Sequence, residues 1–162
     1  VIIWVLRKDI NMNEIVYFDL DGVLANWVEQ YKNKSNIPLE KFEKMSREER
    51  HKIKEKLFNY DFFFTMKPIT KGVNLYKNLV RTGATIAVLS ATGDINKEEV
   101  ARAKRDWVKK YIGDIDVILV DDGEHKWSKR KQGYDKHILI DDRDKVLTAW
   151  KNHGGVAIKF VQ

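Results

Sequence analysis

The fold of this chain is decided by the stretch Ile15-Val16-Tyr17-Phe18-Asp19-Leu20-Asp21-Gly22-Val23-Leu24. A run of strand-forming residues brings two carboxylates, one residue apart, to a glycine turn. Because side chains alternate along an extended backbone, Asp19 and Asp21 lie on the same side of it. Two like charges held this close repel each other unless a cation lies near them. The stretch therefore predicts a strand whose end binds a divalent cation and a phosphate group, which indicates an enzyme.

Composition places the chain among packed globular proteins of one domain. It has 162 residues, 43% of them hydrophobic, enough for a sizeable core. The absence of cysteine excludes disulfides, thiolate metal ligands and thiol nucleophiles, and it suits a reducing cytoplasm. The net charge of +6 favours an anionic partner: a nucleotide, a nucleic acid or a phosphorylated metabolite. No apolar run approaches the roughly 18 residues that a membrane crossing requires.

The first eleven residues allow two interpretations. The chain does not begin with methionine, whereas Met12 lies just before the acidic strand, so residues 1–11 can be sequence upstream of the natural start. Alternatively, their apolar part is a genuine edge strand. That part is about half as long as the apolar region of a signal peptide and lacks basic residues before it. Neither interpretation assigns chemistry to the segment.

Five short apolar runs recur along the chain, with helical patterns between them. The runs are nearly continuous in Val, Ile and Leu, as expected for strands covered on both faces. Apolar residues at a spacing of three or four, such as Val100, Ala103 and Trp107, predict the helices. The alternation predicts an α/β fold with a central parallel sheet between two layers of helices. The predicted strands are 15–20, 84–89, 117–120, 138–140 and 156–160.

One segment departs from this alternation. Residues 26–66 are too long for a connection and too charged for a core. Within them, Ser46-Arg47-Glu48-Glu49 predicts a capping box that opens a helix, and Pro68 marks the return to the main domain. We therefore predict a core formed by residues 12–25 and 67–162. Residues 26–66 are predicted to form a small helical cap over the strand ends, where parallel sheets bind ligands.

Two pairs of acids follow predicted strands. Asp19 ends the first strand, where a carboxylate can attack a phosphoryl group, and Asp21 can move protons to the leaving oxygen and from water. Asp141 and Asp142 follow the strand 138–140, and adjacent carboxylates suit Mg²⁺. Either pair alone can simply end a strand or cap a helix. Together, at the same edge of one sheet, they predict a metal-assisted site.

A hydroxyl and a cation complete the predicted site. Ser90 comes just after the second strand, and its hydroxyl, with free backbone N–H groups at Ala91 and Thr92, can hold phosphate oxygens. A lysine near a transferring phosphoryl group stabilises its charge. The stretch KWSKRK, between the third strand and the acidic pair, supplies three candidates, although a solvated basic face is the ordinary role of such a stretch. These candidates are Lys126, Lys129 and Lys131.

Taken in order, Asp-x-Asp-Gly, Ser, Lys and Asp-Asp at successive strand ends resemble the haloacid dehalogenase (HAD) superfamily of phosphohydrolases. The resemblance extends from residue 15 to near residue 160. It implies a HAD-like Rossmannoid three-layer sandwich, in which Asp19 forms an aspartyl-phosphate and Asp21 is the general acid and base. It also implies that Ser90 binds the phosphoryl group and that a lysine neutralises it. Mg²⁺ would be held by Asp19, the backbone carbonyl of Asp21 and one Asp of the pair 141–142.

A closer resemblance is to the 5′(3′)-deoxyribonucleotidases and their bacterial and phage relatives. It is carried by Asp19-Leu-Asp-Gly-Val-Leu-Ala25, Phe63-Phe64 before Lys67-Pro68-Ile69, Lys104 with Trp107, and Ile138-Leu-Ile-Asp-Asp-Arg143. That family places an aromatic contact to the base eight residues after the nucleophile, where this chain has Trp27. Ordinary packing in the first cap helix is the alternative role of Trp27. Phe63, in the aromatic cluster 62–64, is a second candidate for lining the pocket.

The chain departs from this family in two places. The motif at Ser90 reads Ser-Ala-Thr-Gly rather than the Thr-Ser-Pro type of the vertebrate enzymes, and the cap is shorter, which leaves the preferred base open. The catalytic lysine is also ambiguous. Counting back from the acidic pair gives Lys131, and counting forward from the third strand gives Lys126. We favour Lys126 and keep Lys131 open.

The sequence thus predicts a cytoplasmic, Mg²⁺-dependent phosphatase that acts on (deoxy)nucleoside monophosphates. One alternative keeps the chemistry but acts on nucleic-acid 3′-phosphate ends or on a small phosphometabolite. Another is a phosphate- or nucleic-acid-binding module without catalysis. The predicted partner is a small nucleotide rather than a nucleic acid or a membrane, and the oligomeric state, monomer or homodimer, is left open.

Overall fold

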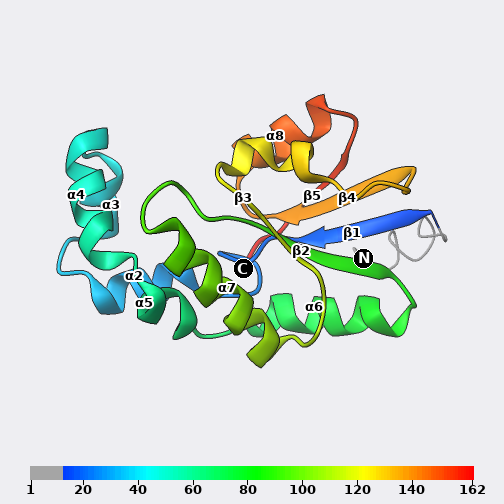
Figure 1. Cartoon of the computed structure of the whole chain (residues 1–162), viewed down its shortest axis with the longest axis horizontal. Helices are drawn as coiled ribbons and strands as arrows, with labels where there is room; N and C mark the ends of the chain where they lie inside the picture. Colours follow the sequence, from blue (N-terminus) through cyan, green and yellow to red (C-terminus); the bar gives the residue numbers. More distant parts are fainter. Residues whose placement is uncertain (1–12) are drawn as a thin grey trace.

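The computed structural model describes residues 13–162 and forms a five-stranded parallel sheet between helical layers (Figure 1). The strand order is β3-β2-β1-β4-β5, so the acidic strand β1 is central. All five predicted strands are present, and the α/β prediction is confirmed. The strands are β1 (Glu14–Phe18), β2 (Thr85–Ala91), β3 (Val117–Val120), β4 (Lys136–Asp141) and β5 (Val156–Lys159). The prediction for residues 1–11 lies outside the described residues.

Two strands extend beyond their predicted ends. β2 continues to Ala91 because Ser90 and Ala91 pair with Leu119 and Val120 of β3. β4 likewise ends at Asp141, which pairs with β5. The sequence predicted Ser90 and Asp141 just after their strands, but the ladder holds both residues inside them. Their side chains are therefore held by the sheet rather than by loops.

Helices cover both faces of the sheet (Figure 1), and alternate residues of the strands belong to two separate apolar clusters. Ile15 and Tyr17 pack with the apolar residues of α8 (Asp144–Asn152). Val16 and Phe18 face the other core, which includes residues of α6 (Thr70–Arg81) and α7 (Lys97–Tyr111). The 3-10 helix η1 (Gly123–Lys129) lies in the layer of α8. This arrangement lets side chains reach the strand ends from both faces.

Between β1 and α6 the chain forms four short helices at the carboxyl ends of the strands (Figure 1). They are α2 (Trp27–Lys34), α3 (Leu39–Glu43), α4 (Arg47–Leu57) and α5 (Tyr60–Phe64). The predicted capping box opens α4: Glu49 N–H donates to Ser46 Oγ at 3.2 Å, and Ser46 N–H donates to Glu49 Oε2 at 2.9 Å. The predicted helical character of this segment is therefore confirmed.

The segment leaves and rejoins the core at neighbouring points. Asn26 N–H donates to the carbonyl of Lys67 at 2.8 Å, and Ile69 N–H donates to that of Leu24 at 2.7 Å. Its buried aromatic residues belong to the same apolar cluster as the strands. The division into core and cap stays a prediction, although these bonds lie at its predicted boundaries. Within residues 13–162, no helix has the length and apolar character needed to cross a membrane.

Candidate active site

Two of the predicted acids meet at the carboxyl ends of the central strands. Parallel pairing of β1 with β4 aligns Phe18 with Ile140, the residues just before Asp19 and Asp141. The N–H of Asp19 donates to the carbonyl of Ile140 at 3.0 Å and extends the ladder by one bond. Asp19 is thereby held beside Asp141, and the two residues are only 5% and 0% exposed.

Lys126 lies between these carboxylates. Its Nζ donates to Asp19 Oδ1 and to Asp141 Oδ2, at 2.7 Å each, and the residue is 1% exposed. Burial alone lowers the pKa of a lysine, but the two carboxylates raise the pKa of Lys126 above its ordinary value, so the group is a cation at neutral pH. Burial and the charge of Asp141 raise the pKa of Asp19.

Asp142 adds a third carboxylate, and Gly22 makes room for it. A Cβ at Gly22 would lie 2.3 Å from Asp142 Oδ2, which is a steric clash. Gly22 also has a φ of +86°, a backbone conformation that residues with a side chain rarely adopt. Burial, followed by the charges of Asp19 and Asp141, raises the pKa of Asp142 to about 7. Three carboxylates thus lie close together, and the Lys126 ammonium is bonded to two of them, so the cluster can accept a further cation.

The donor set fits Mg²⁺. Oxygens of Asp19, Asp141 and Asp142 all lie within 4.8 Å of one another, and carboxylate oxygens are the ligands that Mg²⁺ prefers. Both oxygens of Asp141 are already engaged, one by Lys126 and one by the N–H of Arg143 at 2.9 Å. Among the described residues, the buried Oδ1 of Asp142 has no hydrogen-bond partner. Asp142 rather than Asp141 therefore has an oxygen available for the ion.

A second buried lysine, Lys104, holds the other half of the site. Its Nζ donates to Asp21 Oδ2 at 2.7 Å, to Ser90 Oγ at 3.0 Å and to the carbonyl of Ala91 at 2.6 Å. The residue is 1% exposed, and its ammonium lies 5.1 Å from the centre of the Phe63 ring. Asp21 and Ser90, which the sequence predicted as site residues, are thus joined through a third group.

In the sequence, Lys104 is part of a family likeness and has no predicted role of its own. A stronger signal was present in the helix pattern. Lys104 follows Val100 by four residues and precedes Trp107 by three, so it lies on the buried face of α7. A lysine in such a position is desolvated and needs a partner. That argument from spacing alone could have identified Lys104 as a site residue.

The carboxylates open into a cavity of about 690 Å³ between the sheet edge and the helices α2 to α5. The four predicted substrate-binding residues, Trp27, Phe63, Ala91 and Thr92, all line it. Trp27 stacks on Tyr31, with ring centres 5.4 Å apart and planes 20° apart. This packing fixes the plane of an indole that also faces the cavity, so the two predicted roles of Trp27 are compatible.

The structure corrects the expectation about the N–H of Thr92 and distinguishes between the two candidate lysines. The N–H groups of Thr92 and Gly93 donate to the carbonyls of Val120 and Asp121, because the chain continues the pairing beyond β2. The N–H of Thr92, predicted to be free for phosphate, is therefore engaged. Lys131 pairs with Asp116, which precedes β3 at the opposite end of the sheet, and its side chain is 37% exposed. Only Lys126 of the predicted lysines reaches the carboxylates.

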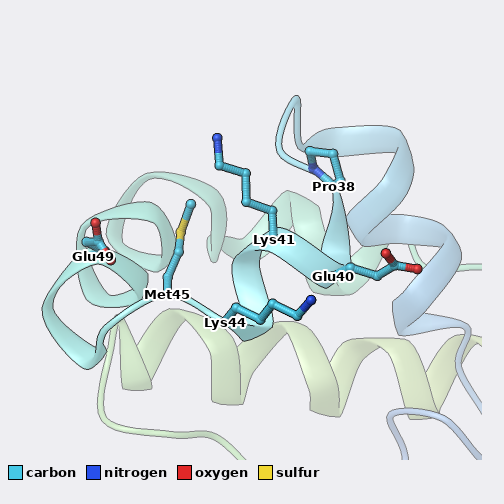
Figure 2. A pocket seen from close by; sticks show the side chains of 6 residues that line it. All are labelled: Pro38, Glu40, Lys41, Lys44, Met45 and Glu49. Atoms are coloured by element: carbon cyan, nitrogen blue, oxygen red, sulfur yellow. The ribbon is translucent and has the colours of Figure 1, made fainter.

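A second hollow, of about 490 Å³, lies on the helical segment between β1 and α6 and carries none of this chemistry (Figure 2). It is open and is formed by α3 and the start of α4. Figure 2 shows that the charged ends of its lysines and glutamates do not converge on one point. The lining residues are Pro38, Glu40, Lys41, Lys44, Met45 and Glu49.

The fold and the site together define a HAD-type hydrolase: a parallel sheet in this order, with two acids after β1 and two at the end of β4. The model of one family, "5' nucleotidase, deoxy (Pyrimidine), cytosolic type C protein" (NT5C), matches residues 13–161. The chain belongs to this family of nucleotidases, which confirms the predicted HAD resemblance and the phosphatase class. No curated protein sequence matches the chain significantly.

Solved structures share the fold at low sequence identity. A HAD hydrolase of family IA, variant 3, from Entamoeba histolytica is 16% identical, with a TM-score of 0.58 over 90% of this chain and 83% of its own. A putative HAD hydrolase from Bacillus subtilis, solved with magnesium, is 12% identical, with a TM-score of 0.54 over 91% and 88%. A chain of a Pnkp1/Rnl/Hen1 complex is 16% identical, with a TM-score of 0.57 over 94% of this chain. The present chain spans only 47% of that protein.

Proposed function

We propose that the protein is a Mg²⁺-dependent phosphomonoester hydrolase that dephosphorylates (deoxy)nucleoside monophosphates through an aspartyl-phosphate on Asp19. The proposal is carried by one observation: Asp19 and Asp21, at the base of one cavity, are each bound to a separate buried lysine. A cavity of about 690 Å³ suits a mononucleotide. The family description supports deoxypyrimidine nucleotides as the first substrates to test. Its term "cytosolic" supports the predicted cytoplasmic location.

The proposed reaction has two displacements at phosphorus. Asp19 attacks the phosphoryl group, its oxygen forms a bond to phosphorus, and the bond to the nucleoside oxygen breaks as Asp21 gives that oxygen a proton. Asp21 then takes a proton from water, whose oxygen attacks phosphorus and releases phosphate and free Asp19. Ser90 binds the phosphoryl oxygens, and the Lys126 ammonium, 2.7 Å from Asp19, stabilises the developing charge.

Asp19, Asp142 and the backbone carbonyl of Asp21 would hold Mg²⁺. When bound, the ion neutralises charge on the phosphoryl oxygens and reduces the repulsion between the carboxylates. The available Oδ1 of Asp142 supports this choice of ligand within the pair 141–142.

Phosphate release from a panel of 5′- and 3′-nucleotides, with Mg²⁺ and with a chelator, tests the proposal. We expect Asp19→Asn to abolish turnover, because an amide cannot act as the nucleophile. Trp27→Ala should raise KM for nucleotides about tenfold through lost stacking, while inhibition by inorganic phosphate stays unchanged. Equal activity of the unaltered protein and Asp19→Asn would refute the assignment of Asp19 as the nucleophile.

A second candidate substrate is a nucleic-acid 3′-phosphate end. It is favoured by Arg47 and Lys54 of α4, which line the cavity and, among the described residues, form no ion pair or side-chain hydrogen bond. Two such cations can hold a second phosphate. Competition between a 3′-phosphorylated oligonucleotide and a mononucleotide discriminates the candidates. If the oligonucleotide is the better substrate and loses affinity in Arg47→Ala and with added salt, the second candidate replaces the first.

A further inference from the structure

Lys104 differs from the other lysines of α7 because its side chain is buried. It projects from the middle of the helix into the layer between α7 and the sheet, where it is buried. An ammonium group has three protons, and Lys104 has three acceptors at 2.6–3.0 Å. The side chain is therefore held in one position, and it holds the groups that accept from it.

The bond to Asp21 places the two oxygens of that carboxylate in different environments. Oδ2 accepts from Lys104 at 2.7 Å, whereas Oδ1 is buried and has no hydrogen-bond partner among residues 13–162. A carboxylate held by one oxygen cannot rotate freely, so the other oxygen keeps one direction. Asp21 lines the cavity, and Oδ1 is its oxygen that accepts no hydrogen bond from the described residues.

The bond to Ser90 has a similar effect on a hydroxyl. Ser90 Oγ accepts from Lys104 at 3.0 Å, which engages one lone pair of the oxygen and leaves the hydroxyl proton for another acceptor. Ser90 also lines the cavity. The phosphoryl oxygen of a bound substrate can therefore accept the hydroxyl proton. One ammonium group thus orients both a proton carrier and a phosphate donor.

We propose that Lys104 is a positioning residue that orients Asp21 toward the leaving oxygen and Ser90 toward the phosphoryl group. The inference rests on the proposed phosphatase function and assigns the two buried lysines different roles in it. Lys126 enters from the layer of η1 and α8 and holds the nucleophile Asp19, whereas Lys104 enters from the opposite face and holds Asp21. Each catalytic aspartate is thus held by its own lysine.

The test compares two leaving groups in Lys104→Met. A nucleoside oxygen leaves poorly without a proton, whereas p-nitrophenolate leaves without one. Since kcat/KM reports the steps up to release of the alcohol, a misoriented Asp21 should lower it about 10²-fold for a nucleotide. The loss with p-nitrophenyl phosphate should be at least tenfold smaller. Lys109→Met, at an exposed lysine of the same helix, is the matched control and should leave both values unchanged.

A double-mutant cycle with Asp21→Asn separates positioning from general damage. If Lys104 acts through Asp21, Lys104→Met in the Asp21→Asn background produces no further loss that depends on the leaving group. Equal losses for both substrates in the single variant, or full leaving-group dependence in the Asp21→Asn background, overturn the inference. Should Lys104→Met not fold, Lys104→Gln keeps a donor without the charge and is measured in the same way. An inactive unaltered protein refutes the proposed function instead.

Discussion

Replacing Lys126 with methionine gives the most direct test of how the site is held together. Methionine keeps the length and the apolar stem of the side chain and removes only the ammonium group. In the native protein this group bridges Asp19 and Asp141 at 2.7 Å each. The variant therefore leaves two adjacent buried carboxylates without a shared cation, and Asp142 lies beside them.

The expected loss of stability is large because all partners are buried. Removing one member of a buried ion pair costs about 3–5 kcal/mol in unfolding free energy. For a chain of this size that loss corresponds to a fall in Tm of roughly 6–20 °C. The two carboxylates raise the pKa of Lys126, so its contribution is complete at neutral pH and is lost only as pH rises above about 10.5.

Urea and thermal unfolding in the presence of a chelator measure this loss, and Lys131→Met is the matched control. Lys131 also pairs with an aspartate, Asp116, but its side chain is 37% exposed, and such surface pairs contribute about 0–1 kcal/mol. We expect Mg²⁺ to restore more stability to Lys126→Met than it adds to the unaltered protein. If both variants lose the same small amount, the buried carboxylates are not held by Lys126, and the reasoning fails.

Two further predictions concern Asp142 and its neighbour. The pKa of Asp142 is raised from 3.8 to about 7, so its contribution to the stability of the metal-free protein is complete below about pH 4 and is lost as pH rises through 7. Mg²⁺ should therefore raise Tm more at pH 8 than at pH 5, and an equal rise at both values would contradict this. Gly22→Ala should abolish the Mg²⁺ response, because its Cβ would meet Asp142 Oδ2. Gly133→Ala, with a similar φ of +92° and open space, should cost only about 1–2 kcal/mol and keep the response.

Much of the fold could be predicted because local patterns and global packing agree. The apolar runs became strands covered on both faces, and Ser46 with Glu49 formed the predicted capping box. Strand ends were less certain, since they depend on neighbours. Ser90 lies within β2 only because β3 pairs that far along it. For the same reason the N–H of Thr92, expected to be free, donates to the carbonyl of Val120, the last residue of β3.

The acids of the site could be predicted because they are adjacent in sequence and stand at strand ends, where parallel strands bring them to one edge. The lysines could not be fully predicted. Lys126 and Lys131 are five residues apart in the same basic stretch, and sequence offered arguments for both. The choice depends on which way the chain turns after β3, and η1 directs Lys126 inward while Lys131 pairs at the other end of the sheet.

The parallel sheet, the helical insertion and the set of acids can be predicted without a structure, because they follow from residue periodicity and from the order of motifs along the chain. The pairing of lysines with carboxylates, in contrast, depends on how distant segments pack in the folded chain. Lys104 and Lys126 come from opposite helical layers and meet Asp21 and Asp19 across more than 80 residues of sequence. No local pattern encodes such pairs. They arise because a buried ammonium group needs acceptors, and the fold brings carboxylates from the strand ends within reach of both lysines.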